Sequence, residues 1–403
     1  MNSRMRSERS WGRLGMKSKL SDICHYVKGK VDVSGLDNVT YISTENMLPD
    51  KGGVTEAATL PNTAQAQIYE HNDVLVSNIR PYFKKIWFAN QDGGCSNDVL
   101  VFRANEGVEP GFLYYVLADE KFFNYSMATS KGTKMPRGDK KTLMEYEVPD
   151  FDIGTQRKVA SLLGEIDEKI ITNNEINKNL EQQAQALFQE KFTNNPDLAS
   201  MNMVPLSELC TVITKGTTPT TLGKPFVASG INFIKAECIL DNHTIDAGKF
   251  AHIDESTNQL LKRSVICPGD IVFTIAGTLG RFALVDETVV PANTNQAVAI
   301  IRPNTEKVTP EYLYSFFIGN WHNDYYTKRI QQAVQANLSL TTIRSLPIPL
   351  LEDNDMAEFV SLISPVFMLM KAKEEENCKL SRLRDTLLPQ LMSGELDVSE
   401  IDL

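Results

Sequence analysis

The sequence lacks several features that would place it in a common class of protein. Its 403 residues contain no run of about 18 apolar residues, so we expect no membrane-spanning helix. Six cysteines occur without a C-x-x-C pair, which argues against disulfides and a zinc site and favours free thiols in a reducing cytosol. The five histidines show no metal-ligand spacing. We therefore expect neither a membrane protein nor a metalloprotein.

Signatures of catalysis are also missing. The chain has no G-x-x-x-x-G-K-[ST] phosphate loop, no G-x-G-x-x-G after a strand, and no asparagine or aspartate before a Pro-Pro-aromatic sequence. Pro149-Asp150 followed by Asp167-Glu168-Lys169 loosely resembles a nuclease metal site. Such a site needs carboxylates that converge from strand ends, whereas Asp167 falls on a predicted helix. We interpret this pattern as surface charge and expect a chain with no catalytic centre and no cofactor of its own.

The net charge of −10 is unevenly distributed. The acidic excess is −3 in residues 17–150 (15 basic, 18 acidic), −3 in 151–200 (5 and 8) and −7 in 351–403 (5 and 12), while 201–350 is neutral (12 and 12). Because net charge bears on solubility and partners and not on local patches, nucleic-acid binding is not excluded. Residues 1–16 carry four arginines, one acid and no apolar stretch, so they are no secretory signal. They are either a disordered basic tail or an extension ahead of a working start at Met16.

Internal duplication is the most informative feature of the chain. Glu109–Tyr114 returns as Thr309–Tyr314, and Ala160-Ser161-Leu162 returns as Val360-Ser361-Leu362, both at an offset of 200. Upstream the offset slips to 197, where Asn72–Val76 resembles Gly269–Phe273, and then to 186. The sequence therefore predicts two related domains whose second halves share a register and whose first halves differ.

Each repeat begins with short β-type runs and continues into helices. The strands are expected at Asp73–Ser77, Ile86–Ala89 and Val99–Arg103 in the first repeat, and at Ile231–Lys235, Asp270–Ile275 and Gln296–Arg302 in the second. A proline in the first helical turn predicts short helices at 110–124 and 310–320.

Each repeat then ends in a long helix with an apolar seam, typical of helices that pair through knobs and holes. The first seam consists of Val159, Leu163, Ile166, Ile170, Asn173, Asn177, Leu180, Ala184 and Leu187. The second consists of Phe359, Ile363, Val366, Met370, Lys373, Asn377, Leu380, Arg384 and Leu387. The polar seam residues either fix register or face solvent in a frayed middle. Pro365 predicts a kink in the second helix or a delayed start.

These elements predict an α+β protein with two duplicated mixed α/β target-recognition domains, separated by two long helices that form an antiparallel coiled coil with pseudo-two-fold symmetry. The expected parts are a tail at 1–16, domains at 17–152 and 201–350, and spacer helices at 153–200 and 351–403. About 38 residues make a helix of about 57 Å. Two DNA-binding domains held at a fixed distance could each contact one half of a split DNA site, with the halves about 34–36 Å apart or a multiple of that distance.

Three stretches of the chain resemble the central conserved region of the DNA-specificity subunits of type I restriction-modification enzymes. They are Val148–Leu163 (VPDFDIGTQRKVASLL), Asp167–Ile170 and Ala186–Phe188. Leu387–Leu396 (LLPQLMSGEL) is similar to the family's C-terminal ending. The resemblance covers the chain from about Lys17 onward, and Glu352–Met356 departs from the family's Q-R helix start.

This resemblance implies a non-catalytic bacterial cytoplasmic subunit that binds double-stranded DNA with a bipartite target. It also implies two methyltransferase subunits bound along the long helices, together with restriction-translocase subunits. S-adenosylmethionine, ATP and Mg²⁺ would serve those partners, and a flipped adenine would enter the methyltransferase. Two other interpretations remain: a bipartite reader for another methyltransferase-nuclease system, and a coiled-coil scaffold with two protein-binding heads.

Candidate DNA-binding residues in the first domain are mostly cations in loops. The segment Lys131–Lys141 holds five cations and one acid, which suits phosphate contact but is also compatible with a solvated loop. A second segment, Arg80–Lys85, mixes cations and aromatics after a strand. The candidates are Lys28, Lys30, Arg80, Tyr82, Lys84, Lys85, Lys131, Thr133, Lys134, Arg137 and Lys140.

Candidates in the second domain are richer in amides and hydroxyls. Asn and Gln can bind adenine edges and Arg can bind guanine, although amides are also common in turns. The candidates are Lys215, Thr217, Thr218, Thr278, Arg281, Asn293, Asn295, Gln296, Gln335 and Asn337.

Overall fold

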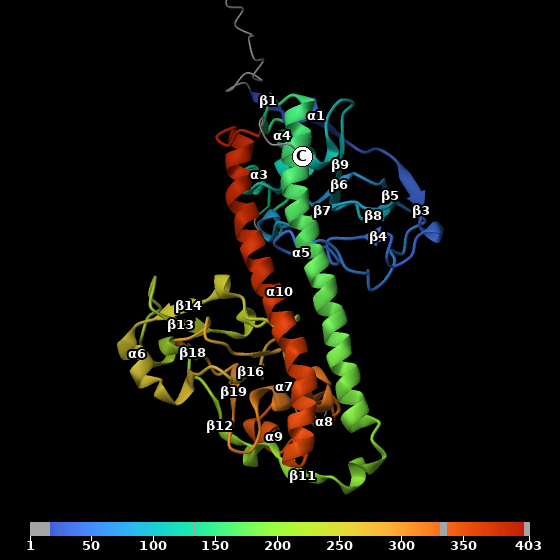
Figure 1. The fold of residues 1–403 in the computed structure, drawn as a ribbon. Helices are drawn as coiled ribbons and strands as arrows, with labels where there is room; N and C mark the ends of the chain where they lie inside the picture. The colour runs from blue at the N-terminus through green and yellow to red at the C-terminus, as the bar shows by residue number, and fades with distance from the viewer. Residues whose placement is uncertain (1–16, 133, 331–336, 399–403) are drawn as a thin grey trace, which may run out of the picture. The chain divides into compact units, whose positions relative to one another are not determined.

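A computed structural model describes residues 17–132, 134–330 and 337–398 (Figure 1). These residues fold into two compact units. Unit 1 contains the described residues up to Ile171 and those from Asn377 onward, and unit 2 contains Thr172–Glu376. Each unit therefore has its own sheets and one end of each long helix. In the described part of the chain, every helix is too short or too polar to cross a bilayer.

The strands of unit 1 form a two-stranded ladder, an antiparallel sheet and a mixed sheet. The ladder pairs β1 (Lys17–Lys19) with β10 (Glu147–Pro149). The antiparallel sheet has the order β2 (Cys24–Tyr26), β9 (Val99–Ala104), β6 (Val74–Ser77) and β7 (Ile86–Phe88). The mixed sheet has the order β3 (Lys30–Asp32), β5 (Gln65–Tyr69), β8 (Gly93–Cys95) and β4 (Tyr41–Ile42). β6 is buried throughout, as its continuous apolar sequence predicts.

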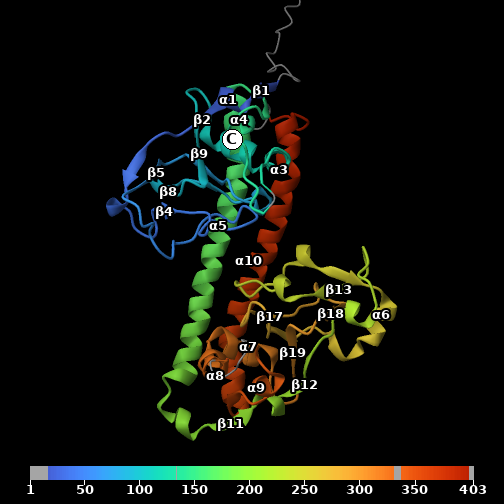
Figure 2. The same cartoon turned by 180° about the vertical axis from the view of Figure 1, so that it is seen from behind.

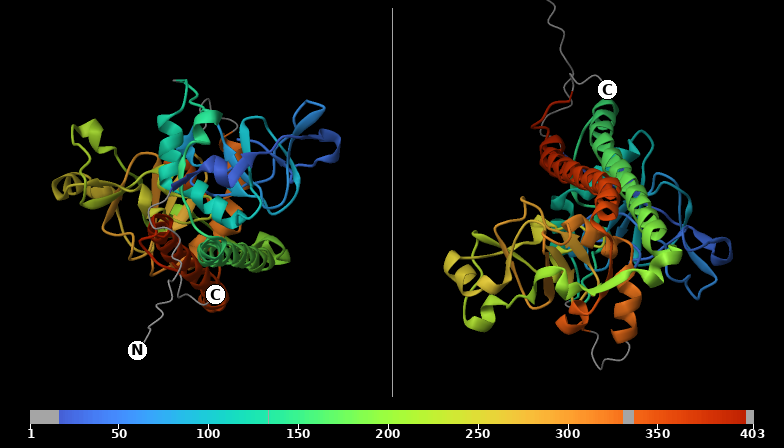
Figure 3. Two further views of the ribbon diagram at one scale, coloured as in Figure 1. Left: turned by 90° about the horizontal axis from the view of Figure 1, so that it is seen from above. Right: turned by 60° about the horizontal axis from the view of Figure 1, so that its bottom comes forward.

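The helices of unit 1 close over the antiparallel sheet. They are α1 (Leu20–Ile23), α2 (Pro110–Ala118), α3 (Glu120–Ala128) and α4 (Lys140–Leu143). Asp119 separates α2 from α3, because its side chain accepts a hydrogen bond from the Lys121 amide and so caps α3. The core of unit 1 joins these helices to the ends of the long helices, with Leu163 and Leu391 in the same cluster. Seen from above, the blue and cyan part of unit 1 lies on one side of the long helices (Figure 3, left).

Unit 2 repeats this arrangement (Figure 2). The ladder pairs β11 (Asn202–Pro205) with β20 (Pro347–Leu350). The antiparallel sheet has the order β12 (Cys210–Lys215), β19 (Val298–Pro303), β16 (Ile271–Thr274) and β17 (Phe282–Leu284). The mixed sheet has the order β14 (Ala251–Ile253), β13 (Ile231–Ile234), β18 (Ala292–Thr294) and β15 (Val265–Ile266).

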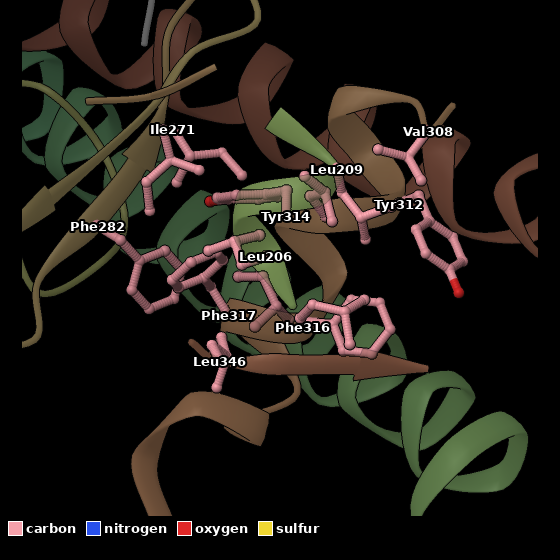
Figure 4. Close-up of a cluster of buried hydrophobic side chains, with 14 of the residues drawn as sticks. Leu206, Leu209, Ile271, Phe282, Val308, Tyr312, Tyr314, Phe316, Phe317 and Leu346 are labelled. Atoms are coloured by element: carbon pink, nitrogen blue, oxygen red, sulfur yellow. The ribbon is translucent and has the colours of Figure 1, made fainter. Parts of the chain in front are cut away.

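The helices of unit 2 are α6 (Glu255–Leu260), α7 (Pro310–Ile318), α8 (Trp321–Ile330) and α9 (Leu340–Arg344). Their core is strongly aromatic: Tyr312, Phe316 and Phe317 of α7 belong to one cluster with Leu206 and Leu346. The close-up of Figure 4 shows Phe316 and Phe317 near Leu206 and Leu346, and Tyr312 beside Val308. The Phe192 ring packs between Phe316, at a centroid distance of 4.8 Å, and Phe359 of the second long helix, at 5.3 Å. Aromatic packing of this kind attaches the helix ends to the rest of unit 2.

The mixed sheets show where the two repeats diverge. Three strands correspond, since β4 runs parallel to β8 and β13 parallel to β18, while β5 and β15 are antiparallel to β8 and β18. The fourth strand is added at opposite edges: β3 pairs with β5, whereas β14 pairs with β13. The duplication predicted from the sequence is thus confirmed, and the difference between the first halves is an added edge strand in a different place.

The long helices are α5 (Ile153–Phe188, 36 residues) and α10 (Asp353–Ser393, 41 residues). Within each unit the two helix ends run antiparallel (Figure 1). The predicted seam residues are buried or half-buried along both helices, including Asn173 and Asn377. The register role of these two asparagines stays a prediction.

Of the two alternatives at Pro365, a kink or a delayed start of the second helix, the delayed start is wrong. α10 is already helical at Asp353, twelve residues before Pro365. Pro365 is exposed, so its ring faces away from the core. Burial of Phe359 and Ile363 in the core of unit 2 outweighs the cost of an interior proline, about 3 kcal/mol.

Candidate nucleic-acid interface

Two loops of unit 1 come together at the end of β6. In the first loop, residues 78–85, Pro81–Phe83 form a single 3-10 turn between Arg80 and Lys84, which both have a left-handed φ of 50°. The Arg80 amide donates to the Pro136 carbonyl at 2.9 Å, and Ile79 bridges Arg137. The second loop, residues 130–132 and 134–140, is therefore held against the first, and its last residue, Lys140, begins α4. We call these two loops the first recognition edge.

Side chains on the first recognition edge differ in how firmly they are held. Tyr82 and Phe83 are 48% and 38% exposed, with ring centroids 4.6 Å apart. Arg80, Lys134 and Lys140 are exposed and have no ion pair among the described residues. An exposed aromatic pair beside such cations suits contact with bases or sugars next to phosphates.

The other predicted cations of this edge already have partners. Lys131 pairs with Asp139, and Arg137 Nη2 lies 3.1 Å from Asp98 Oδ1. The Lys131 ammonium and the amides at the start of α4 lower the pKa of Asp139 to about 2. Exposed pairs of this kind contribute only about 0–1 kcal/mol, so a phosphate could replace the carboxylate.

Lys84 and Lys85 are more firmly engaged. Lys84 Nζ lies 2.8 Å from Glu120 Oε1 at the start of α3. Lys85 Nζ donates to the Thr44 carbonyl at 2.6 Å and is half-buried. Both lysines therefore attach the first recognition edge to neighbouring parts of unit 1. Their contact with DNA stays a prediction.

Lys28 and Lys30 occupy a different place. Both are exposed, in the connection into β3 and on β3 itself, which is the edge strand of the mixed sheet. The Gly29 carbonyl between them accepts from the Ile68 amide of β5 at 3.2 Å. They form a second cationic group at a sheet edge.

Unit 2 uses the same backbone framework with different side chains. The Ile275 amide donates to the Ala297 carbonyl at 2.8 Å, as the Asn78 amide donates to Asp98 at 2.8 Å in unit 1. The Leu338 amide then donates to the Ile275 carbonyl at 3.0 Å. We call the described residues 275–281, 295–297 and 337–338 the second recognition edge. Its exposed side chains include Thr278 and Asn337. Two predicted residues, Thr133 in the first half of the chain and Gln335 in the second, lie outside the described residues.

Predicted residues near β12 meet at the end of that strand. Gly216 amide donates to the Asn295 carbonyl at 3.0 Å, and Thr218 Oγ1 donates to Gln296 Oε1 at 2.5 Å. A Cβ atom on Gly216 would lie 1.8 Å from the Thr294 carbonyl oxygen, so only glycine fits. These contacts bring Lys215, Thr217 and Thr218 next to the amide turn at 295–296, as a set.

Arg263 belongs to this group and is not apparent from the sequence. Its Nη2 lies 3.3 Å from the Lys215 carbonyl and 3.5 Å from Thr217 Oγ1. It follows α6, in a segment without a turn motif or a repeat equivalent. Only the tertiary fold places it beside a strand end 48 positions earlier.

One predicted contact is wrong. Asn293 is 0% exposed, and its amide group is fully used inside the protein. Its Oδ1 accepts from Ser264 Oγ and the Thr294 amide, and its Nδ2 donates to Asn258 and the Leu261 carbonyl. Asn293 is therefore a structural residue of β18 with no surface for a base.

Arg281 is partly exposed, but an exposed carboxylate already binds its guanidinium. Its Nε and Nη2 each lie 2.6 Å from a carboxylate oxygen of Asp241, and Nη1 donates to the Ile239 carbonyl at 3.3 Å. A bidentate pair fixes the orientation of the guanidinium. Any guanine contact by Arg281 would have to replace this pair.

The nuclease-like pattern at Asp167 has a structural explanation. Asp167 Oδ2 accepts from Tyr115 Oη at 2.8 Å, and Asp167 Oδ1 pairs with Arg384 Nη1 at 2.8 Å. These residues join α2, α5 and α10 within unit 1. At the equivalent positions of unit 2, an offset of 200 away, stand Ser315, Phe367 and Ala184. Unit 1 thus fastens the helix ends with a polar cluster where unit 2 uses apolar packing.

Both halves of the chain match one sequence family. Residues 15–182 and 200–376 each match the type I restriction modification DNA specificity domain. The chain is similar to the type I restriction enzyme HindI specificity subunit of Haemophilus influenzae, with 24% identity over 468 aligned positions that cover 94% of this chain and 98% of that protein. It is also 20% identical to the MjaVIII specificity subunit of Methanocaldococcus jannaschii, covering 95% of this chain and 93% of that protein.

A solved structure shares the fold. The type I restriction-modification S subunit from M. genitalium superimposes with a TM-score of 0.56 at 15% identity, covering 94% of this chain and 96% of that chain. At this identity the likeness concerns the fold alone.

Proposed function

This chain belongs to the type I restriction-modification DNA specificity family, and on that premise we propose that it recognises a bipartite target on double-stranded DNA, one half through each unit. The observation that carries this proposal is the pair of recognition edges. They share the same backbone hydrogen bonds, Asn78 to Asp98 and Ile275 to Ala297, yet they present different side chains. Two related surfaces of different chemistry fit two different half-sites.

The two edges support different kinds of contact. Arg80, Lys134 and Lys140, which have no ion pair within the described ranges of the chain, suit phosphates, which position a protein on DNA without reading sequence. Thr278, Gln296 and Asn337 offer hydroxyl and amide groups that can bind base edges. The second edge therefore reads bases mainly through polar neutral groups, and the first combines cations with the aromatic pair Tyr82 and Phe83.

The chain acts without chemistry of its own in this proposal. Partner subunits carry the reactions: two methyltransferase subunits that use S-adenosylmethionine, and restriction-translocase subunits that use ATP and Mg²⁺. The long helices α5 and α10 are the expected binding surface for those partners. The absence of a phosphate loop from the sequence and the structural role of Asp167 support a non-catalytic chain.

Methylome sequencing tests this function. The chain is co-purified with a modification subunit from the same organism, and adenine methylation is mapped in cells with and without this gene. Methylation of a split motif that disappears with the gene is the expected result, and it reveals both half-sites. Unchanged methylation would contradict the proposal and favour a protein scaffold.

A further inference from the structure

A hairpin whose tip residue reaches a long helix recurs in both units, next to the recognition edge. The first hairpin, residues 47–54, is closed by a bridge between Met47 and Val54, and the second, residues 239–245, by a bridge between Ile239 and Ile245. Each has a residue of left-handed φ at its tip, Lys51 at 62° and His243 at 64°. The tips lie in the parts of the repeats that differ most in sequence. Similar local sequences therefore do not explain why both hairpins occupy the same place.

The first hairpin contacts the loop of residues 78–85 in the first recognition edge and also contacts the long helix α10. The Asp50 amide donates to the Phe83 carbonyl at 2.8 Å, and the Lys51 amide donates to the Lys84 carbonyl at 3.0 Å. The Lys51 side chain is only 10% exposed, with Nζ 4.0 Å from Asp385 of α10 and 3.8 Å from Glu120. Burial lowers the pKa of Lys51, and the two carboxylates oppose that shift.

The same path continues into the helix pair. Asp385 Oδ1 lies 3.0 Å from Arg384 Nη2, and Arg384 pairs with Asp167 of α5. A continuous chain of charged groups therefore links the backbone of Phe83 and Lys84 to both helices of unit 1.

The second hairpin makes the equivalent connection with other residues. Asp241 and the Ile239 carbonyl hold Arg281 of the second recognition edge. His243 stacks on Phe282, with ring centroids 4.1 Å apart and an angle of 17° between the planes. Its Nε2 lies 3.6 Å from Glu181 Oε1 of α5. The tip again contacts the loop on one side and an acid of a long helix on the other.

We propose that Lys51 and His243 are positioning residues that hold each recognition edge against the long helices, and that each sets the specificity for one DNA half-site. This inference rests on the proposed function. Neither residue needs to contact DNA, since both act through neighbours: Lys51 through the carbonyls of Phe83 and Lys84, and His243 through Phe282 next to Arg281. Sequence discrimination depends on how rigidly such loops are held.

The first test is hydrogen exchange on the full chain, co-purified with its modification subunit and without DNA. The variants are Lys51→Met, which keeps the length of the side chain, and His243→Phe, which keeps the ring on Phe282. We expect exchange of the Asp50 and Lys51 amides to rise in K51M by roughly 5- to 30-fold. Lys51→Arg should restore protection, and Lys121→Met, an exposed lysine on α3, is the matched control.

The second test is the methylome of cells that produce each variant. K51M should methylate sites with one altered base in one half of the motif, and H243F should do so in the other half. The same relaxation in both halves, or no relaxation in either, would overturn the inference. If K51M does not fold, Asp385→Asn removes the same contact from the side of the helix.

The two tests separate the inference from the function on which it rests. If the parent gene confers no split-motif methylation, the proposed function fails whatever the exchange data show. If the parent methylates its motif and K51M leaves both exchange and specificity unchanged, the positioning role alone fails.

Discussion

The guanidinium of Arg103 binds the carboxylate of Asp73 through both oxygens, at 2.7 and 2.8 Å. Asp73 is 1% exposed and also accepts from the Glu70 amide at 2.7 Å. Unit 2 contains the same cluster, in which Arg302 binds Asp270 at 2.7 and 2.8 Å and the Cys267 amide donates to Asp270. The pair fixes the turn into one of the two central strands of each antiparallel sheet. The hydrogen bonds to the aspartate, together with its charge, raise the pKa of each arginine.

Removing the arginine should cost more than neutralising the aspartate. Arg103→Met leaves a buried carboxylate without its cation, which costs about 3–5 kcal/mol in comparable cases. Asp73→Asn removes the buried charge and should cost about 1–3 kcal/mol. Urea unfolding of the full chain measures both. Arg157→Met, at an exposed arginine of α5, should change stability little, and an equal loss in R103M and R157M would contradict this prediction.

Cations of the first recognition edge should control the salt dependence of DNA binding. In the proposed function Arg80, Lys134 and Lys140 each contact one phosphate, so an alanine at any one of these positions should remove one such contact. The plot of log K against log salt has a negative slope, and its magnitude should decrease by about 0.9 for each contact removed. The loss of affinity should be similar on all duplex sequences. Binding of the purified complex to a fluorescent duplex at several salt concentrations measures the slope. Lys17→Ala, at a lysine paired with Glu147 on the ladder, should leave it unchanged.

Gly216→Ala should damage the second recognition edge. The new Cβ would meet the Thr294 carbonyl oxygen at 1.8 Å, so β12 must move away from the amide turn at 295–296. We expect a loss of about 1–3 kcal/mol in unfolding free energy and weaker discrimination in one half-site. Gly35→Ala is the control, because its Cβ would meet nothing within 4 Å. Equal effects of the two substitutions would refute the steric argument.

His322 should make unit 2 sensitive to mild acid. Burial among Phe273, Phe282 and Phe317 lowers the pKa of His322 from 6.5 to about 4. The unfolded chain therefore binds a proton between pH 6.5 and 4 that the folded chain does not, so stability is full above pH 6.5 and falls as the pH drops.

From pH 7 to pH 5 this loss amounts to about 2 kcal/mol. His322→Phe should remove that part of the pH dependence, as measured by urea unfolding at both pH values. A variant of the exposed His71 should keep the dependence of the parent. A parent whose stability is the same at both pH values would contradict the buried neutral state of His322.

The sequence predicts elements that local patterns determine. The run Val74–Val76 is apolar and contains two β-branched valines, and β6 (Val74–Ser77) forms there. The four-three spacing of the seam predicts long helices, and α5 and α10 extend over 36 and 41 residues. The offset of 200 predicts the duplication because both copies keep the same helix starts, Pro110 and Pro310.

Other features depend on contacts between distant segments. β4 has only two residues, Tyr41 and Ile42, and pairs with Gly94 and Cys95 some 50 positions later, so no local pattern marks it. Asn293 resembles a loop amide in the sequence, yet Ser264, Asn258 and the Leu261 carbonyl bury it. The exposed candidates remain predictions, because a loop composition does not show which side chain meets a base.

The edge strands β3 and β14 have a consequence for how such proteins change over time. Each is attached to one side of a three-stranded core, and the two units use opposite sides. A strand at the margin of a sheet can be gained, lost or rebuilt without breaking the hydrogen bonds of the strands behind it. Mutation can therefore change the surface of one repeat while the three-stranded core stays the same. A new target could arise in this way without a new fold.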